Sequence, residues 1–457
     1  MALKKVELRG KKVLVIGAGK SGIAATRLLL RHGAEVVLAD SQKVDLPPFP
    51  DKVRLVLGEY PSAKEFDLLV LSPGVPLTVP PVREAKEAGI EIVGELELAF
   101  RFARAPVVAV TGTNGKTTTT ALTGAIFQAA GLRTWVAGNI GLPLSEVVEE
   151  ARPEDILVVE VSSFQLETTS TFKPVVAVIL NLTPDHLDRH GDFNSYRQAK
   201  ARIFARQTDK EVTVLNYDDP EVRNMAADSC GRVLFFSRRH KLATGVWVAK
   251  GEILVKWEGV EGKVTEVASL ALPGAHNLEN ALAATAAAVA QNVPLEVIGR
   301  VLREFKGVAH RLELVAEING VKYVNDSKGT NPEATIKALE AYDCPIVLIA
   351  GGRNKGSDFR LLASKMKEKV KALVLIGESA PLLAAQAKAA GVSDIVLARD
   401  LPDAVRRARE KARPGDVVLL SPACASWDMF RNYEERGECF RQAVKELIQE
   451  EARTERR

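Results

Sequence analysis

The fold is decided by the segment Val110-Thr111-Gly112-Thr113-Asn114-Gly115-Lys116-Thr117-Thr118. It follows the apolar residues 107–110, which predict a buried strand, and precedes a helix-length segment that contains Leu122 and Ile126. A strand, a glycine turn and a helix N-terminus in this order direct backbone N–H groups and the positive end of the helix dipole at a phosphate. We therefore expect a phosphate-binding loop made of Gly112, Thr113, Asn114, Gly115, Lys116, Thr117 and Thr118.

Two side chains of this loop carry the expected chemistry. Lys116 would reach the terminal phosphates of a nucleotide, and the hydroxyl group of Thr117 would bind Mg²⁺. Val110 stands where the usual G-x-x-x-x-G-K-[ST] pattern has its first glycine. A generic P-loop ATPase is therefore less favoured than a family with the shorter G-x-x-G-K-T form. The alternative is a glycine turn with a solvated lysine.

The composition is typical of a soluble protein with a large core. The chain has 457 residues, of which 46% are hydrophobic, and this length predicts about three domains. A net charge of +4 is close to balance, so we expect no nucleic-acid partner. The four cysteines show neither zinc nor redox spacing, which indicates free thiols in a reducing compartment. No apolar run approaches the roughly 20 residues of a spanning helix, so we expect no membrane insertion. We also expect a cytoplasmic protein that is a monomer.

Short β-branched runs alternate with helix-length segments, which is typical of parallel sheets covered by helices. The predicted fold class is α/β, with domains at residues 1–105, 106–309 and 310–457. Strands are expected at 12–16, 35–39, 68–71, 107–110, 156–161, 175–180, 321–325, 346–350, 372–376, 395–398 and 417–420. Residues 245–266 are expected to be more hairpin-like, because glycines interrupt them.

A second glycine turn, Gly17-Ala18-Gly19-Lys20-Ser21-Gly22, lies between the first expected strand and a helix expected at 21–31. Asp40 follows about 20 residues later at the end of the next strand, so the spacing matches a dinucleotide fingerprint. The same geometry suits the diphosphate of NAD and that of a UDP-sugar. The turn alone does not decide between them.

Two polar residues follow buried strands of the second domain. Glu160 lies at the carboxyl end of an apolar strand, where ligands bind in open α/β sheets, and beside a phosphate loop it is expected to bind Mg²⁺. His186 lies in a loop beside Asp185 and near His190, and an imidazole and carboxylates can share a metal ion. The alternatives are a solvated glutamate and a histidine that only forms structural hydrogen bonds.

Lys200 falls on the apolar face of a helix expected at residues 195–207, between Tyr196, Ile203 and Phe204. Burial favours the neutral amine and lowers the pKa of a lysine. A neutral amine can add CO₂ to become a carbamate, an anion able to bind a metal. The alternative is an ordinary lysine whose ammonium group extends to solvent.

The form T-G-T-N-G-K-T-T of the phosphate loop resembles that of the ATP-dependent Mur ligases of peptidoglycan synthesis. Four further segments carry the same resemblance: Leu71-Ser72-Pro73-Gly74-Val75, Glu160-Val161-Ser162-Ser163-Phe164-Gln165-Leu166-Glu167, Asn181-Leu182-Thr183-Pro184-Asp185-His186-Leu187-Asp188 and Ser421-Pro422-Ala423-Cys424-Ala425-Ser426-Trp427-Asp428. The resemblance covers essentially the whole chain in order. It implies a Rossmann-like N-terminal domain that binds a UDP-sugar, a central P-loop ATPase domain with a mostly parallel sheet, and a Rossmann-like C-terminal domain that binds an amino acid.

The resemblance also implies roles for individual residues. Implied in substrate binding are Lys20, Ser21, Gly22, Asp40, Ser41, Ser72, Pro73, Gly74, Asn139, Ser162, Gln165, His186, Thr330, Lys355, Ser426 and Tyr433. Implied in nucleotide binding, besides the phosphate loop, are Asn277 and Asn280 near the adenine, Arg311 at phosphate and Asp326 at the ribose. The two asparagines could instead cap a helix. Implied at two Mg²⁺ sites are Thr117, Glu160, His186 and a CO₂-derived carbamate on Lys200, and implied in catalysis are Lys116, His186, Lys200 and Lys328.

The implied reaction uses ATP to join UDP-N-acetylmuramoyl-L-alanine and D-glutamate. Transfer of the γ-phosphoryl group to the L-alanyl carboxylate gives an acyl phosphate, which the amine of D-glutamate attacks to release phosphate and form the amide. The products besides the amide are ADP and phosphate. Two other classes of protein stay open. A folylpolyglutamate-type or other Mur-type ligase would share the central chemistry. An NAD-dependent or non-catalytic binding protein would explain only the glycine turn at residues 17–22.

Overall fold

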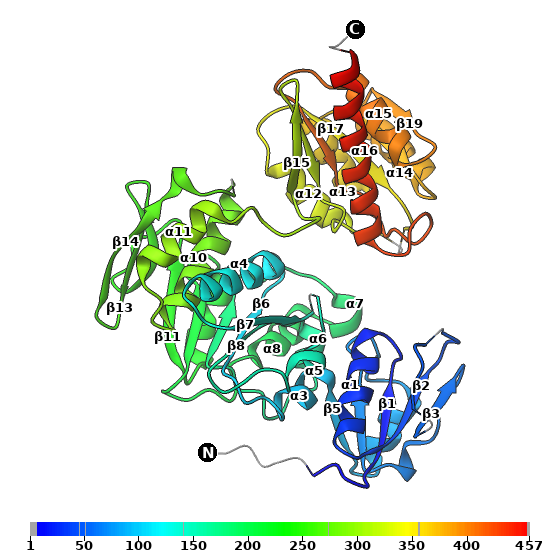
Figure 1. Ribbon diagram of the computed structural model, residues 1–457, viewed down its shortest axis with the longest axis vertical. Coiled ribbons are helices and arrows are strands. Elements are labelled where there is room, and N and C mark those ends of the chain that lie inside the picture. The colour runs from blue at the N-terminus through cyan, green and yellow to red at the C-terminus, as the bar shows by residue number, and fades with distance from the viewer. Residues whose placement is uncertain are drawn as a thin grey trace. The chain divides into compact units, whose positions relative to one another are not determined.

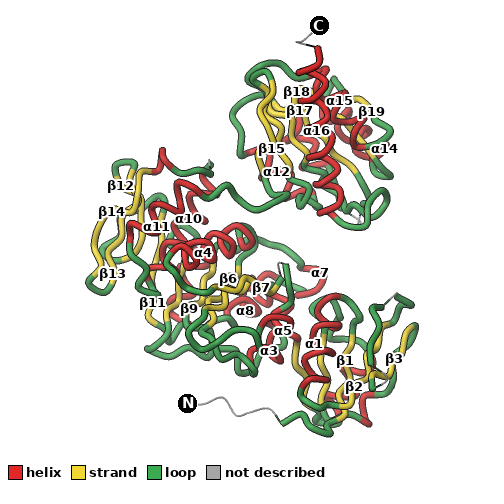
Figure 2. Tube along the Cα trace, in the orientation of Figure 1, coloured by secondary structure: helices red, strands yellow, loops and turns green. Residues whose placement is uncertain are grey.

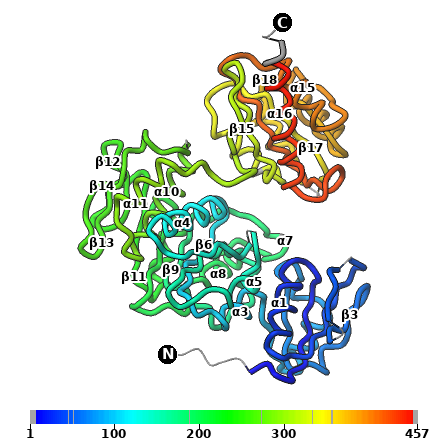
Figure 3. Tube along the Cα trace, viewed as in Figure 1, coloured from blue at the N-terminus to red at the C-terminus, as the bar shows by residue number. Residues whose placement is uncertain are grey.

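The computed structural model describes residues 7–454 except 45, 51, 140, 273, 355 and 356, and only the backbone of residues 188, 333 and 452–454. The chain forms two compact units, the first made of Met1–Ala271 with His276–Phe305 and the second of Leu272–Ala275 with Lys306–Arg457. Figure 3 follows the chain through them by colour. Three mostly parallel sheets with covering helices confirm the expected α/β class (Figure 2).

The first sheet is parallel throughout and has the strand order β3-β2-β1-β4-β5 (Figure 1). Its elements are β1 (Lys12–Ile16), α1 (Lys20–Arg31), β2 (Glu35–Asp40), β3 (Val53–Leu57), β4 (Leu68–Leu71), α2 (Pro80–Glu87), β5 (Glu91–Gly94) and α3 (Glu95–Phe100). The strands expected at 12–16, 35–39 and 68–71 are confirmed. The edge strands β3 and β5 escaped prediction because each is partly exposed, at Arg54 and Glu91 among others, and neither is a continuous apolar run.

The central sheet has the strand order β14-β13-β12-β11-β10-β9-β6-β8-β7. Its strands are β6 (Val107–Thr111), β7 (Thr134–Gly138), β8 (Ile156–Glu160), β9 (Val176–Ile179), β10 (Val212–Asn216), β11 (Arg232–Ser237), β12 (Gly245–Ala249), β13 (Glu252–Trp257) and β14 (Val260–Glu266). Its helices are α4 (Lys116–Ala129), α5 (Leu144–Val147), α6 (Ser163–Leu166), α7 (Leu187–His190), α8 (Phe193–Ala201), α9 (Pro220–Asn224), α10 (Ala275–Val289) and α11 (Leu295–Glu304). The strands expected at 107–110, 156–161 and 175–180 are confirmed to within one residue, and the hairpin-like region forms antiparallel β12, β13 and β14.

The helix expected at residues 195–207 is wrong at its C-terminal end, because α8 ends at Ala201. After it the backbone tightens into three-residue turns, with Ile203 N–H donating to Lys200 and Phe204 N–H donating to Ala201. This turn buries the side chains of Ile203 and Phe204, which are 0% and 3% exposed. Burial of these two apolar residues therefore comes from the turn, and Lys200 remains in the last turn of α8.

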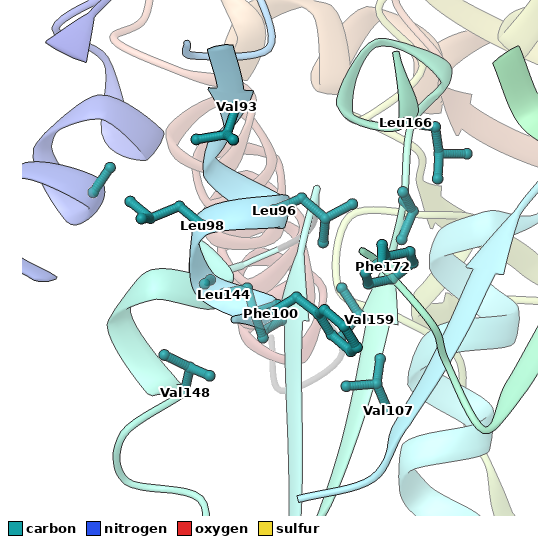
Figure 4. Packing of buried hydrophobic residues seen from close by; sticks show 14 of the residues in the cluster. Val93, Leu96, Leu98, Phe100, Val107, Leu144, Val148, Val159, Leu166 and Phe172 are labelled. Atoms are coloured by element: carbon teal, nitrogen blue, oxygen red, sulfur yellow. The ribbon is translucent and has the colours of Figure 1, made fainter. Parts of the chain in front are cut away.

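The first and central sheets share one hydrophobic core, shown in Figure 4. Leu96, Leu98 and Phe100 of α3 pack in the same cluster as Val107 of β6 and Phe172 of the central domain. The Phe100 and Phe172 rings meet edge to face with centroids 5.0 Å apart. The first two domains therefore form one unit because α3 belongs to the core of both.

A buried carboxylate strengthens this junction. Glu97 of α3 accepts hydrogen bonds from the backbone N–H groups of Ser170, Thr171 and Phe172, from the hydroxyls of Ser170 and Thr171, and from Nε of Arg101. Burial alone would raise the pKa of Glu97, but these donors together lower it below its usual value. The ionised side chain is therefore the form that the fold requires.

Replacing Glu97 with glutamine is expected to lower the free energy of unfolding by about 3 kcal/mol, because an amide NH₂ group would face N–H donors in a buried site. Urea denaturation of the first unit, followed by circular dichroism, would measure this. Glu91→Gln is the matched control, because Glu91 pairs with the same Arg101 but its side chain is 54% exposed. We expect a loss below about 1 kcal/mol there. Equal losses in the two variants would contradict the prediction.

The C-terminal sheet has the strand order β15-β16-β20-β17-β18-β19, in which only the β15 and β16 pair is antiparallel among the described pairs. Its elements are β15 (Glu313–Ile318), β16 (Val321–Asn325), α12 (Pro332–Glu340), β17 (Ile346–Gly351), α13 (Arg360–Lys369), β18 (Val370–Ile376), α14 (Ala380–Ala390), β19 (Ile395–Leu397), α15 (Leu401–Lys411), β20 (Val417–Leu420) and α16 (Tyr433–Thr454). The five strands expected here are confirmed to within two residues. Within the described part of the chain, every helix is too short or too polar to span a bilayer.

Candidate functional site

The phosphate loop forms as expected between β6 and α4. Gly115 is the N-cap of α4 in a left-handed conformation with φ 85°, and a Cβ there would overlap the side-chain oxygen of Asn280. Lys116 begins the helix, and its Nζ donates to the carbonyl oxygens of Gly112 at 2.9 Å and Thr113 at 2.7 Å. Thr117 and Thr118 follow and are buried. The loop therefore places a lysine and a helix N-terminus side by side.

Asn181, which follows β9, fixes the shape of this loop. Its side-chain oxygen accepts from Asn114 N–H at 2.8 Å, and its Nδ2 donates to the carbonyl of Asn114 at 3.1 Å. Its backbone carbonyl accepts from Thr113 N–H at 2.9 Å. Asn181 stood in a quoted motif but was given no role from the sequence. The Asn181 side chain pairs with both the N–H and the carbonyl of Asn114, and the sequence contains no pattern that predicts this contact.

The two asparagines of α10 lie inside the helix, which begins at Ala275, so the alternative that they cap it is wrong. Asn280 is 5% exposed and its Oδ1 accepts from the Thr119 hydroxyl at 3.2 Å. Its Nδ2 lies 3.4 Å from Oδ1 of Asn277. Asn280 therefore packs directly on the phosphate loop and its helix.

Glu160 ends β8 and is 2% exposed, so the solvated alternative is wrong. Its Oε1 accepts from Nδ2 of Asn139 at 2.8 Å, whereas its Oε2 is buried and accepts no hydrogen bond from any described residue. A buried, unpaired carboxylate oxygen is costly unless a cation or a proton satisfies it. This oxygen is the observation that fits a metal ion. Among the described residues no three His, Cys, Asp or Glu side chains form a metal-binding group by themselves.

His186 and His190 have different surroundings. His186 is the left-handed N-cap of α7, its side chain is 51% exposed, and its Nε2 lies 3.5 Å from Oδ2 of Asp185. His190 is buried, with Nε2 3.0 Å from the Ser163 hydroxyl and Nδ1 3.2 Å from Oε1 of Glu167. Burial is the main reason why the pKa of His190 is lowered. His186 is therefore the accessible imidazole, and both nitrogens of His190 are engaged.

Lys200 is 2% exposed, so the alternative of a solvated ammonium group is wrong. Its Nζ donates to the Gly112 carbonyl at 2.9 Å and to the Thr111 hydroxyl at 3.4 Å, and lies over the ring of Tyr196 at 4.8 Å. Burial, assisted by the charge of Lys116, holds the pKa of Lys200 well below its usual value, against the opposite effect of Asp185 and Glu160. The structure thus places a buried amine with a lowered pKa beside the phosphate loop.

Ser162 and Gln165 form a capping box on α6. The Ser162 hydroxyl accepts from Gln165 N–H at 3.3 Å, and Oε1 of Gln165 accepts from Ser162 N–H at 2.9 Å. Their role in the structure is to fix the segment that follows Glu160. Their implied contact with substrate stays a prediction.

The glycine turn of the first domain is braced by Ser72 and Asp40. The Ser72 hydroxyl donates to the Gly17 carbonyl at 2.8 Å, and Oδ2 of Asp40 accepts from Ala18 N–H at 2.8 Å. A Cβ at Gly22 would overlap the Gly17 carbonyl, so α1 can approach the turn this closely only with glycine at that position. Lys20 and Ser21 begin α1, and Ser41, Pro73 and Gly74 lie in the loops after β2 and β4, at the same edge of the sheet.

The second unit brings its predicted residues together at the carboxyl ends of β16 and β20. Asp326 accepts from the Ser421 hydroxyl at 2.7 Å, and Gly329 N–H donates to the Asp326 carbonyl. Nζ of Lys328 lies 5.7 Å from the ring centre of Tyr433. The side-chain oxygen of Asn331 accepts from Ala334 N–H and caps α12, and Pro332 lies in the first turn of that helix.

Three other predicted residues of this unit differ in surroundings. Ser426 is 2% exposed and its carbonyl accepts from Met429 and Phe430 N–H groups. Arg311 contributes a positive charge next to Asp326. Lys355 lies outside the described residues.

Arg436 of α16 was not predicted. It is 1% exposed, and its guanidinium donates to the hydroxyl and carbonyl of Ser327 and to the carbonyl of Cys424. It therefore fixes both loops that carry Lys328 and Ser426. A lone arginine at the start of an amphipathic helix gives no sequence signal of this.

The pH dependence of stability should report Asp326. Burial raises the pKa of Asp326 to about 6, although Arg311 and the Ser421 hydroxyl oppose this. An unfolded aspartate has a pKa of about 3.9, so between about pH 4 and pH 6 the folded state binds more protons. The contribution of this group to the free energy of unfolding therefore falls as pH rises through that range. Urea denaturation between these pH values should show the slope in the wild type and not in Asp326→Asn, and parallel profiles would contradict it.

Comparisons with known proteins agree with this arrangement. The chain matches the family models for the Mur ligase MurD-like N-terminal domain at residues 11–94, the Mur ligase middle domain at 110–288 and the Mur ligase glutamate ligase domain at 310–424. Proteins named UDP-N-acetylmuramoylalanine–D-glutamate ligase are 57% identical in Pelotomaculum thermopropionicum, covering 96% of this chain and 98% of that protein, and 44% identical in Clostridioides difficile, covering 97% and 100%.

Solved structures show the same fold at lower identity. The UDP-N-acetylmuramate–alanine ligase MurC of Thermotoga maritima superposes with a TM-score of 0.60 at 18% identity, over 96% of this chain and all of that one. The MurF ligase of the same organism, in complex with ADP, gives a TM-score of 0.58 at 20% identity, over 97% of each chain. The expected resemblance is thereby confirmed, and the chain belongs to the Mur ligase family, in the group of relatives named UDP-N-acetylmuramoylalanine–D-glutamate ligase.

Proposed function

We propose that this protein is an ATP-dependent ligase that joins D-glutamate to UDP-N-acetylmuramoyl-L-alanine in peptidoglycan synthesis. The observation that carries the proposal is the buried amine of Lys200, whose Nζ lies 2.9 Å from the Gly112 carbonyl of the phosphate loop. A plain phosphate-binding loop does not need a second, buried lysine with a lowered pKa. The names of the relatives at 57% and 44% identity support the same activity.

The proposed chemistry activates a carboxylate, which is a poor electrophile because of its charge and resonance. The γ-phosphoryl group of ATP passes to an oxygen of the L-alanyl carboxylate, giving an acyl phosphate and ADP. The amine of D-glutamate, once deprotonated, attacks the acyl carbon, and phosphate leaves with its bridging oxygen. Lys116 and the helix N-terminus it begins would offset negative charge as the phosphoryl group moves, and we assign the same role to the charge of Arg311.

Magnesium binding is part of the proposal. The unpaired Oε2 of Glu160 fits a divalent cation, and Asn139 holds the other oxygen of the same carboxylate. The hydroxyl of Thr117, the imidazole of His186 and a carbamate on Lys200 would complete the donors of two ions. When bound, Mg²⁺ supplies positive charge near the phosphate oxygens.

The carbamate would form when the neutral amine of Lys200 adds to CO₂ and loses one proton. The lowered pKa of Lys200 supports this, because only the unprotonated amine reacts. An anion would then replace a buried amine and would compensate the charge of a nearby cation. In this proposal, burial of Lys200 favours the unprotonated amine that the carbamate requires.

The first and third domains would bind the two remaining substrates. We assign residues 1–105 to the UDP-sugar, 106–309 to ATP and 310–457 to the amino acid. Backbone at Lys20, Ser21 and Gly22 would hold the diphosphate at the N-terminus of α1, with Asp40 and Ser41 near the uridine and residues 72–74 beside the sugar. Asn277 and Asn280 would lie at the adenine and Asp326 at the ribose. Thr330, Lys355, Ser426 and Tyr433 would hold D-glutamate, with Lys328 near the reacting atoms.

Phosphate release tests the proposal. Purified protein would be incubated with ATP and Mg²⁺ while UDP-N-acetylmuramoyl-L-alanine or D-glutamate is omitted in turn. We expect release only when both are present, with a product heavier by one glutamyl unit. Release without either substrate would indicate a plain ATPase, and absence of release with all substrates would contradict the ligase. L-glutamate and other amino acids in place of D-glutamate would define the selectivity.

A further inference from the structure

Arg189 of α7 connects two domains at the candidate site. Its Nη1 donates to the Pro73 carbonyl at 2.8 Å and its Nη2 lies 3.3 Å from the Val75 carbonyl, both in the loop after β4 of the first domain. The same Nη2 donates to Oε2 of Glu167 in the central domain at 2.8 Å. The two side chains of this ion pair are 18% and 14% exposed, so solvent screens it less than a surface pair.

Glu167 is held from its other side by the neighbour of Arg189. Nδ1 of His190 lies 3.2 Å from Oε1 of Glu167, and Nε2 of the same ring lies 3.0 Å from the Ser163 hydroxyl. Arg189 and His190, the last two residues of α7, therefore contact different oxygens of the Glu167 carboxylate. This fixes the short helix against α6.

Phe164 joins this arrangement to His186. The guanidinium of Arg189 lies 4.1 Å from the centre of the Phe164 ring, and the His186 ring meets the same ring edge to face at 4.8 Å. His186 also has a left-handed backbone with φ 53°, which a non-glycine residue adopts only when its surroundings hold it there. The contacts of Arg189 are thus next to those that orient His186.

We propose that Arg189 is a positioning residue, which ties the loop at residues 72–75 to the turn that carries His186. The loop lies beside the proposed UDP-sugar site and His186 beside the proposed phosphoryl-transfer site. Arg189 would thereby place the acceptor carboxylate correctly for transfer. The inference rests on the proposed function. It gives a role to a residue that directly follows a quoted motif position but was assigned none from the sequence.

Two substitutions test this. Arg189→Met removes the charge and the donors, and Arg189→Lys keeps the charge, but one ammonium group cannot replace the planar fork that reaches two carbonyls and a carboxylate. We expect the KM for UDP-N-acetylmuramoyl-L-alanine to rise about tenfold and kcat to fall about tenfold in Arg189→Met, since misplacement of about 1 Å costs on the order of a hundredfold. The KM for ATP should stay within about twofold. Arg189→Lys should show the same changes in KM and kcat to a smaller extent. It remains a test if Arg189→Met does not fold.

Arg31→Met is the matched control. Arg31 of α1 also joins the first domain to the central one, through Glu149 and the Ser145 carbonyl, but it touches neither loop of the site. We expect its kinetic constants to stay within about twofold of wild type. A merely structural role for Arg189 would lower the melting temperature and kcat while leaving the KM for the UDP-sugar unchanged, and that result would overturn the proposal.

A second readout separates this inference from the proposed function. Calorimetric titration of UDP-N-acetylmuramoyl-L-alanine without ATP should give a higher Kd, and so weaker binding, in both Arg189 variants than in wild type and Arg31→Met. Equal affinity in all four proteins would overturn the positioning role while leaving a working ligase. If wild type and Arg31→Met release no phosphate with all substrates present, the proposed function fails and this inference with it.

Discussion

Replacing Lys200 with alanine is expected to lower the rate of ligation by about a thousandfold. The buried Nζ donates to the Gly112 carbonyl at 2.9 Å, so its loss removes a group from the floor of the phosphate loop. Under the proposed function it also removes the carbamate and with it one anionic donor for Mg²⁺. The measurement is phosphate release under saturating ATP, acceptor and D-glutamate.

Small carboxylates should partly restore this variant. Formate or acetate can enter the space that the side chain leaves and supply the missing anion, so the rate should rise with their concentration in Lys200→Ala and not in wild type. Lys173→Ala is the matched control, because Lys173 lies in the same domain and pairs with Glu211 while its own side chain is 40% exposed. We expect it to keep wild-type activity. Full activity in Lys200→Ala would rule out both the carbamate and any catalytic role for the amine.

Replacing Glu160 with glutamine should have an effect of similar size, a loss on the order of a hundredfold to a thousandfold in phosphate release. The neutral amide keeps the volume and can still accept from Asn139, but it removes the charge of the buried oxygen that has no hydrogen-bond donor among the described residues. The fold should not suffer, because an unpaired buried carboxylate costs more than a buried amide. Titration with Mn²⁺ in place of Mg²⁺ measures metal binding without turnover. Glu160→Gln should bind Mn²⁺ more weakly than wild type.

Glu95→Gln is the control for this variant. Glu95 also has a buried Oε2 without a described hydrogen-bond donor, and its Oε1 accepts from Ser145 N–H at 2.7 Å. Burial raises the pKa of Glu95, which lies in α3 and not beside the phosphate loop. We expect metal binding to stay unchanged in Glu95→Gln. A loss in metal affinity as large as that of Glu160→Gln would contradict the assignment of Glu160.

The sequence predicted the parts of the fold that repeat along the chain. Buried central strands such as β1, β6 and β17 consist mainly of consecutive apolar residues, and this pattern predicts a buried strand. The strands that escaped prediction include the edge strands β3 and β5, whose mixed exposure gives no clear period. The end of α8 was placed too late because Ile203 and Phe204 keep the helical spacing, although a turn buries them.

The candidate site divides in the same way. Residues within motifs, such as Lys116, Glu160 and Lys200, lie at or beside the phosphate loop. Residues that hold those motifs in place could not be predicted, because their partners are distant in the chain. Arg189 contacts Pro73 across 116 positions and Arg436 contacts Ser327 across 109. Such pairs are set by tertiary packing and leave no local pattern.

The core that α3 shares between the first two sheets has a consequence for substrate length. Because the glycine turn at Gly17 and the phosphate loop at Gly112 belong to one compact unit, the packing of α3 opposes changes in the span between them. Under the proposed function, the protein therefore selects its acceptor by the distance between the uridine and the carboxylate of that acceptor. A precursor already extended by a further amino acid would overshoot the phosphoryl group, which would give the step its place in an ordered assembly without any additional recognition element.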